Sequence, residues 1–143
     1  MFPVTSKILI IDDTALMRAM MRDFLKNMGY TKIVDAPDGE AAWAEIEKAT
    51  RENNPFTLII SDWNMPVLSG LELLKRVRQS SKVPFIMLTA ETEKEKVMEA
   101  LREGVTSYIT KPFTVQIVKE KLKTVYDKLY PASAGKDLKS KVG

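Results

Sequence analysis

Five polar side chains in this sequence stand at or just beyond the ends of short apolar runs. They are Asp12 and Asp13 after Lys7–Ile11, Asp62 after Phe56–Ile60, Thr89 after Pro84–Leu88, and Lys111 after Thr106–Ile109. In a parallel sheet with helical crossovers, ligands bind outside the carboxyl ends of the strands, where the strand order reverses. Three carboxylates, one hydroxyl and one ammonium could therefore share one site.

Carboxylates gathered in one place repel one another unless a cation lies between them. Mg²⁺ suits such a place, because it prefers an octahedron of oxygens and keeps several water ligands. We expect Asp13 and Asp62 to bind Mg²⁺ directly and Asp12 to bind through water. A backbone carbonyl near Asn64 would complete the protein's share.

The same residues suit phosphoryl transfer, in which positioning and charge neutralisation do most of the work. Asp62 is the expected acceptor, because carboxylates form aspartyl phosphates in other enzymes. Lys111 could pair with the added charge, and the Thr89 hydroxyl could donate a hydrogen bond to it. The chain has no histidine and no glycine-rich nucleotide loop, so the donor must be another molecule.

Each of these residues has a simpler explanation when taken alone. Asp12-Asp13 could form a helix-capping turn, Asp62 could be a loop acid, Thr89 could precede a helix, and Lys111-Pro112 could be a turn. Their joint placement at successive strand ends favours a shared site over these separate explanations.

Composition narrows the class of protein. The chain has 143 residues, 45% of them hydrophobic and 29% charged, which is typical of one globular domain. It has no cysteine or histidine, which excludes thiol catalysis, disulfides and the usual zinc sites. We expect a cytoplasmic monomer that binds neither membranes nor nucleic acid, because no apolar run spans a bilayer and the late lysines lack interleaved aromatics.

Strand and helix patterns alternate five times along the chain. The expected strands are Lys7–Ile11, Lys32–Ala36, Phe56–Ile60, Pro84–Leu88 and Thr106–Ile109. Alternation of this kind predicts an α/β fold with a doubly wound, five-stranded parallel sheet, in the flavodoxin-like order 2-1-3-4-5, and five helices. In that order the first and third strands are neighbours, so the aspartates after them should meet.

The helices are predicted from apolar residues at helical spacing. Their core stripes are Met17 to Met28, then Ala42, Ile46 and Ala49, then Leu73, Leu74 and Val77, then Val97, Ala100 and Leu101, and finally Val118, Leu122, Val125 and Leu129. The methionines fit a core stripe better than a promiscuous groove. Arg51–Pro55 reads as a polar loop, residues 1–130 as one domain, and residues 131–143 as a disordered tail.

At these residues the chain resembles the receiver domains of two-component response regulators, and within them the stand-alone chemotaxis receivers. The resemblance covers about residues 6 to 130. The matching segments are Ile10 to Asp13, Met17-Arg18, Asp38-Gly39, Ser61 to Pro66, Gly70 to Leu74, Leu88 to Glu91, Gly104, and Tyr108 together with Lys111 to Thr114.

The resemblance implies a role for each matching site residue. Asp62 would accept the phosphoryl group, and Asp12, Asp13 and the Asn64 carbonyl would hold Mg²⁺. Thr89 and Lys111 would sense the phosphate, Tyr108 would be an aromatic rotamer switch, and Asn64 and Glu91 would influence the phosphoryl lifetime. Lys111-Pro112 resembles the family's cis peptide, and the fourth helix, fifth strand and fifth helix resemble its output face.

The function implied is a single-domain signalling switch, not an enzyme acting on other substrates. It would catalyse its own phosphorylation from a histidine kinase, catalyse its own dephosphorylation with the help of a phosphatase partner, and bind a target such as the flagellar motor switch. A phosphorelay intermediate or a receiver unrelated to motility is the main alternative. A small-molecule phosphatase and a flavin-binding module fit less well.

Four features depart from the family pattern. Thr14 stands in place of a larger aromatic, Ser69 in place of a common acid, Arg51–Asn54 looks like a small insertion, and the tail is extra. Thr14 bears on phosphate access and dephosphorylation rates, and the tail leaves the partner open.

Overall fold

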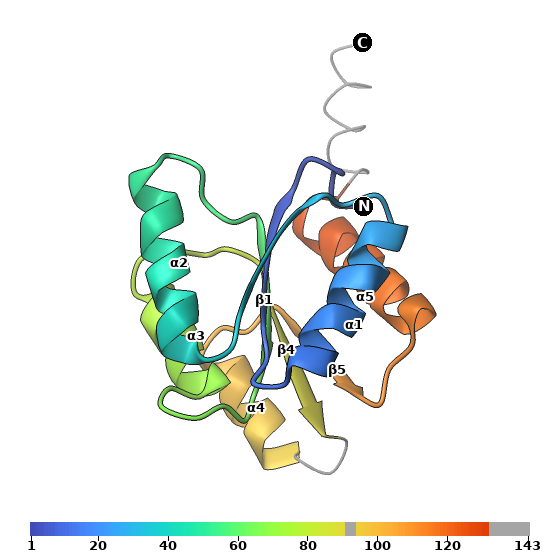
Figure 1. Ribbon diagram of the computed structural model, residues 1–143. Helices are drawn as coiled ribbons and strands as arrows, with labels where there is room; N and C mark the ends of the chain where they lie inside the picture. Colours follow the sequence, from blue (N-terminus) through green and yellow to red (C-terminus); the bar gives the residue numbers. More distant parts are fainter. Residues whose placement is uncertain (91–93, 132–143) are drawn as a thin grey trace, which may run out of the picture.

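A central sheet of five parallel strands organises the chain. The computed structural model describes residues 1–90 and 94–131 (Figure 1). The strands lie in the order β2-β1-β3-β4-β5, which confirms the predicted topology. They are β1 (Lys7–Ile11), β2 (Lys32–Ala36), β3 (Leu58–Asp62), β4 (Phe85–Ala90) and β5 (Ser107–Lys111).

Helices cover both faces of this sheet (Figure 1). They are α1 (Ala15–Asn27), α2 (Gly39–Arg51), α3 (Gly70–Arg78), α4 (Lys94–Arg102) and α5 (Val115–Leu129). Buried side chains of α1 and α5 form one core with the sheet, and those of α2, α3 and α4 form a second core on the other face. The central strands are apolar on both faces for this reason.

The helix boundaries follow from local capping chemistry. Thr14, Asp38, Ser69 and Thr114 have extended backbones, and each side chain accepts an N–H from the first turn of α1, α2, α3 and α5 respectively. Such caps satisfy amides that have no partner within the helix. In α1, Met21 is buried and Met17, Met20 and Met28 pack against the same core, which confirms the predicted methionine stripe.

Three strands begin and end later along the chain than the sequence pattern predicted. Strand β3 starts at Leu58 rather than Phe56, and its last residue is Asp62; β4 includes Thr89, and β5 runs on to Lys111. Parallel pairing depends on backbone groups, so polar side chains can continue a ladder that hydropathy would end. Phe56 packs instead beneath Lys7, whose Nζ lies 4.7 Å from the ring centroid.

Two residues predicted to face the core are exposed, and one predicted loop residue is helical. Leu101 is 48% and Leu129 39% exposed. The short helix α4 buries only Ala100 fully, and at the end of α5 the Tyr126 ring contacts Tyr130, with centroids 4.9 Å apart. Arg51 is the last residue of α2, so the polar loop begins after it. The predicted disorder of the tail lies outside the described residues from residue 132 onward.

Tyr30 ties the amino-terminal segment to the α1 and α5 face, and this tie gives a stability prediction. Its ring is 1% exposed and its hydroxyl donates to the Phe2 carbonyl at 2.8 Å. Tyr30→Phe is expected to cost about 1–3 kcal/mol, because it leaves a buried carbonyl without its donor. Urea unfolding at pH 8 would measure this cost, with Tyr130→Phe at an exposed position as the control.

The stability of the protein at alkaline pH should also depend on Tyr30. Burial raises the pKa of Tyr30 above its ordinary value of 10.0, so the folded protein holds this proton more tightly than the unfolded chain does. Its contribution is fully present below pH 10 and is lost as pH rises through the folded pKa. Tyr30→Phe should therefore lose less stability than the wild type between pH 9 and pH 11. Parallel losses in both proteins would contradict this assignment.

Candidate functional site

The strand register gathers the predicted acids at the carboxyl edge of the sheet. Ile11 of β1 lies opposite Ser61 of β3, so the next residues, Asp12 and Asp62, are neighbours. One carboxylate oxygen from each of Asp12, Asp13 and Asp62 lies within 4.8 Å of the others. Asp12 and Asp62 are 2% and 6% exposed, whereas Asp13 faces solvent. The expected convergence of these three aspartates is therefore present.

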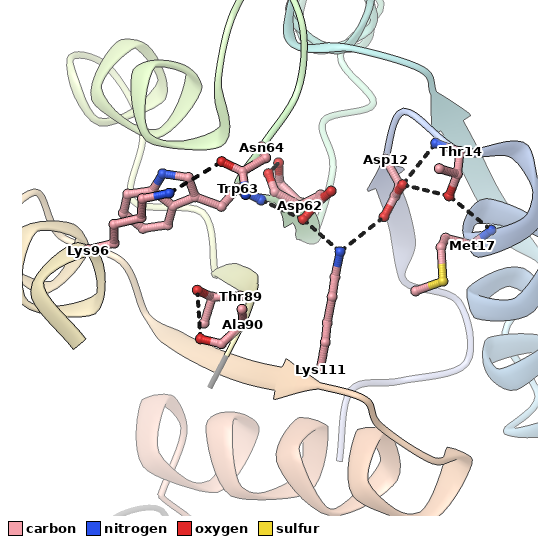
Figure 2. A network of polar contacts seen from close by, with 11 residues as sticks. Asp12, Thr14, Met17, Asp62, Trp63, Asn64, Thr89, Ala90, Lys96 and Lys111 are labelled. Atoms are coloured by element: carbon pink, nitrogen blue, oxygen red, sulfur yellow. Dashed lines mark hydrogen bonds and ion pairs between the residues drawn. The ribbon is translucent and has the colours of Figure 1, made fainter. Parts of the chain in front are cut away.

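The two oxygens of Asp12 have different surroundings (Figure 2). Oδ1 accepts the Thr14 backbone N–H at 2.9 Å and the Thr14 hydroxyl at 3.0 Å. Oδ2 is buried, and no donor among the described residues hydrogen-bonds it; Lys111 Nζ lies 3.9 Å away. A buried carboxylate oxygen normally has a partner, so Oδ2 is suited to a cation.

Asp62 accepts hydrogen bonds from both the backbone and Lys111. Its Oδ1 accepts the Trp63 backbone N–H at 2.8 Å and the Lys111 ammonium at 2.9 Å. Burial raises the pKa of Asp62 above its ordinary value; Lys111 opposes that change, and the charge of Asp12 adds to it. A second cation in the cluster would favour the ionised form of Asp62.

Lys111 reaches this cluster from the edge strand β5, two strands away from β3. It is the last residue of β5 and lies opposite Ala90 of β4. Its ammonium contacts carboxylates of both β1 and β3. The peptide bond to Pro112 is cis, which agrees with the family resemblance.

Thr89 lies on β4, between β3, which carries Asp62, and β5, which carries Lys111. Its side chain is 1% exposed, and its hydroxyl donates to the Ala90 carbonyl at 3.4 Å. The neighbouring residue Leu88 pairs with Asp62, which places Thr89 at the same edge of the sheet (Figure 2).

Asn64 lies beside the cluster, and Tyr108 lies on β5 opposite Met87, three residues before Lys111. Lys96 of α4 donates to Asn64 Oδ1 at 3.4 Å, and its ammonium lies 5.8 Å from the Trp63 ring centroid (Figure 2). Tyr108 is 37% exposed, with Lys121 Nζ 5.5 Å from its ring centroid. Glu91, the other residue expected to affect the phosphoryl lifetime, lies outside the described residues.

The surroundings of the cluster provide access from solvent. A hollow of about 350 Å³ is lined by Asp13, Trp63, Asn64, Met65, Pro66 and Ser69. Of the three acids, Asp13 is the one that lines this hollow. The atoms of the cluster that could bind a metal ion are carboxylate oxygens. Oxygen ligands suit a hard divalent cation and not a soft one.

Sequence reasoning missed Lys96, and it noted Thr14 only as a departure from the family pattern, without its bonds to Asp12. The capping role of Thr14 could have been suspected, because threonine is a preferred residue at the start of a helix. Lys96 carries no local signal, since its approach to Asn64 depends on how α4 packs.

Among the described helices, none is both long and apolar enough to cross a membrane.

Comparisons with known proteins agree with this geometry. The response regulator receiver domain model matches residues 8–123. Over 122 residues the chain is 41% identical to the chemotaxis protein CheY1 of Helicobacter pylori, covering 83% of this chain and 95% of that protein. It is 35% identical to the chemotaxis protein CheY of Pseudomonas aeruginosa, covering 86% and 98%.

Solved structures give the same result. The chemotaxis response regulator CheY4 of Vibrio cholerae superposes with a TM-score of 0.75 at 38% identity, covering 85% of this chain and 98% of that one. A two-component response regulator from Clostridium difficile gives a TM-score of 0.77 at 26% identity, with 88% and 99% covered. The chain belongs to the response regulator receiver domain family, with a CheY-like sequence and fold.

Proposed function

We propose that this protein is a phosphorylation-activated signalling switch whose acceptor is Asp62. The main support for this proposal is the buried Asp62 carboxylate, which accepts a hydrogen bond from Lys111 and is grouped with two further aspartates. In the proposed step a carboxylate oxygen of Asp62 attacks the phosphorus of a phosphohistidine on a kinase. The new P–O bond forms as the P–N bond breaks, and the departing imidazole takes up a proton.

Magnesium is the proposed cofactor of this step. Asp12, Asp13, Asp62 and the Asn64 backbone carbonyl would hold it, and its charge would neutralise phosphoryl oxygens during transfer. With Lys111 and one divalent ion present, the formal charges of the three carboxylates are balanced before transfer. Hydrolysis of the acyl phosphate, modulated by Asn64 and Glu91 and by a phosphatase partner, would reset the switch.

The output is a change in binding to a downstream partner. A shift from about 1% to 99% active needs roughly 5.5 kcal/mol of differential interaction. Charge-assisted hydrogen bonds at about 1.5–3 kcal/mol each from Thr89, Lys111 and backbone donors could supply it. We propose that Tyr108 changes rotamer as Thr89 moves toward the phosphoryl group.

The proposed target is the flagellar motor switch. Several relatives at this level of similarity are chemotaxis proteins. The face formed by α4, β5 and α5 exposes Met98, Leu101 and Tyr108 by 55%, 48% and 37%, and exposed apolar side chains are typical of partner surfaces. We place this switch in the cytoplasm as a monomer, with residues 1–130 as the receiver unit.

Phosphorylation from a small donor tests the proposed function directly. Incubation with acetyl phosphate and Mg²⁺ should add one phosphoryl group per chain, detected by intact mass, and peptide mapping should locate it on Asp62. Chelation of Mg²⁺ with EDTA should prevent the addition. An unmodified protein, or a label on another residue, would disprove the proposal.

Thr89 should affect output more than acceptance of the phosphoryl group. Thr89→Ala removes one hydrogen bond to a charged group, worth about 1.5–3 kcal/mol. We expect near-complete phosphorylation but roughly ten- to hundredfold less enhancement of binding to a motor-switch peptide. Thr89→Ser keeps the hydroxyl and serves as the control. Equal enhancement in Thr89→Ala and the wild type would refute this role.

A further inference from the structure

The Thr14 side chain joins a helix cap to a carboxylate of the acidic cluster. Its hydroxyl accepts the Met17 N–H at 3.4 Å at the start of α1. The same hydroxyl donates to Asp12 Oδ1 at 3.0 Å, and the Thr14 backbone N–H donates to that oxygen at 2.9 Å (Figure 2). One residue therefore supplies both hydrogen bonds to Oδ1.

This arrangement differs from the other side-chain caps that the structure describes. Asp38 and Thr114 accept helix N–H groups, and Ser69 forms a capping box with Glu72 of its own helix. Only at Thr14, among these four, does the capping hydroxyl also donate to a carboxylate of the cluster. Capping alone therefore does not account for both of its bonds.

The consequence for Asp12 is a fixed orientation. With both donors on Oδ1, rotation of the carboxylate would break two hydrogen bonds, so Oδ2 stays directed at the cluster. Oδ2 is buried, and no described donor satisfies it. The Arg18 guanidinium also holds the Asp12 backbone carbonyl at 2.7 Å, so the main chain at this residue is held as well.

We infer that Thr14 is a positioning residue that presents Asp12 Oδ2 to a divalent cation. This inference rests on the proposed magnesium site. Groups that hydrogen-bond a metal-ligating side chain typically change metal affinity by about 10–100-fold when removed. Because valine, alanine and serine all keep the backbone N–H at position 14, loss of the hydroxyl alone should lie at the weaker end of this range.

The decisive comparison is between Thr14→Val and Thr14→Ser. Valine keeps the branched shape without the hydroxyl, and serine keeps the hydroxyl. Isothermal titration of MgCl₂ into the full chain should give a dissociation constant about tenfold higher for Thr14→Val. Thr14→Ser should stay near the wild type. Thr14→Ala provides a second variant without the hydroxyl.

Thr114→Val is the matched control for the loss of a cap. Thr114 caps α5 with the same kind of hydroxyl bond, to Ile117 N–H at 3.2 Å. Thr114→Val should lower the melting temperature of the metal-free protein as Thr14→Val does, but leave magnesium affinity unchanged.

The possible outcomes distinguish failure of the Thr14 inference from failure of the proposed magnesium site. If the wild type binds Mg²⁺ and Thr14→Val and Thr14→Ala bind it equally well, Thr14 has only a capping role and the inference is wrong. If Thr114→Val weakens binding as much as Thr14→Val, the effect is general destabilisation and the inference is again wrong. If the wild type itself shows no magnesium binding, the proposed metal site fails and the inference fails with it.

Discussion

Asp62→Asn is expected to reduce labelling by acetyl phosphate from about one phosphoryl group per chain to none. An amide is a far poorer nucleophile than a carboxylate, and in this step the acceptor oxygen must form the new bond to phosphorus. The fold should survive, because the Asn oxygen can still accept the Trp63 N–H and the Lys111 ammonium, which Asp62 now accepts at 2.8 and 2.9 Å. Intact mass and circular dichroism would measure the two effects separately.

Two further variants test whether the loss of labelling is specific to Asp62. Asp127→Asn changes an exposed acid on α5 that pairs with Lys123, and it should label fully. Asp13→Asn removes one proposed magnesium ligand but leaves the acceptor, so labelling should slow and recover partly at higher magnesium concentration. Undiminished labelling of Asp62→Asn would show that another residue accepts the phosphoryl group.

Gly70→Ala is expected both to destabilise the fold and to disturb Asp62, the proposed acceptor. A β-carbon at Gly70 would overlap the Asp62 backbone carbonyl oxygen and lie 2.9 Å from Met87 Sδ and 3.1 Å from Trp63 Cα. Overpacking of this kind typically costs about 1–3 kcal/mol, sometimes more. Alanine's better helix propensity would offset about 1 kcal/mol at most. The net effect should be a loss of stability, measured by urea unfolding.

The same substitution should also affect phosphorylation, because the nearest obstructing atom is the backbone carbonyl oxygen of Asp62, the proposed acceptor. The Gly70 N–H donates to the Trp63 carbonyl at 2.9 Å, so α3 cannot move outward without pulling on the end of β3. We expect slower labelling by acetyl phosphate in the folded fraction.

Gly104→Ala is the appropriate comparison. Gly104 has a φ of 91°, which strains any residue with a β-carbon, but its neighbours are atoms of the long Arg78 side chain at 3.4 Å or more. It should lose stability by about 1–2 kcal/mol through backbone strain and label at the normal rate. Normal stability and labelling in Gly70→Ala would show that α3 adjusts freely.

The sequence was sufficient to predict the sheet order and the meeting of the aspartates. Both follow from topology: parallel strands require crossovers, and the strand order 2-1-3-4-5 brings the ends of β1 and β3 together. No knowledge of individual side-chain contacts was needed for these features.

Features that depend on side-chain geometry were not predictable in this way. The choice of Asp12 Oδ1 by Thr14 depends on a rotamer, and the approach of Lys96 to Asn64 depends on the packing of α4. The exposure of Leu101 and Leu129 reflects how narrow the buried stripes of α4 and α5 are at these positions. Hydropathy also ended β3 and β5 too early, because backbone pairing continues through Asp62 and Lys111.

The two separate cores have a practical consequence for engineering. The α1 and α5 layer and the α2, α3 and α4 layer each pack on their own side of the sheet, while Asp12, Asp62, Thr89 and Lys111 stand on or directly after the strands. The outward surface of either layer could therefore be redesigned to recognise a new ligand without rebuilding the reactive edge. A biosensor made in this way would keep the residues at the strand ends and change only the surface that binds the ligand.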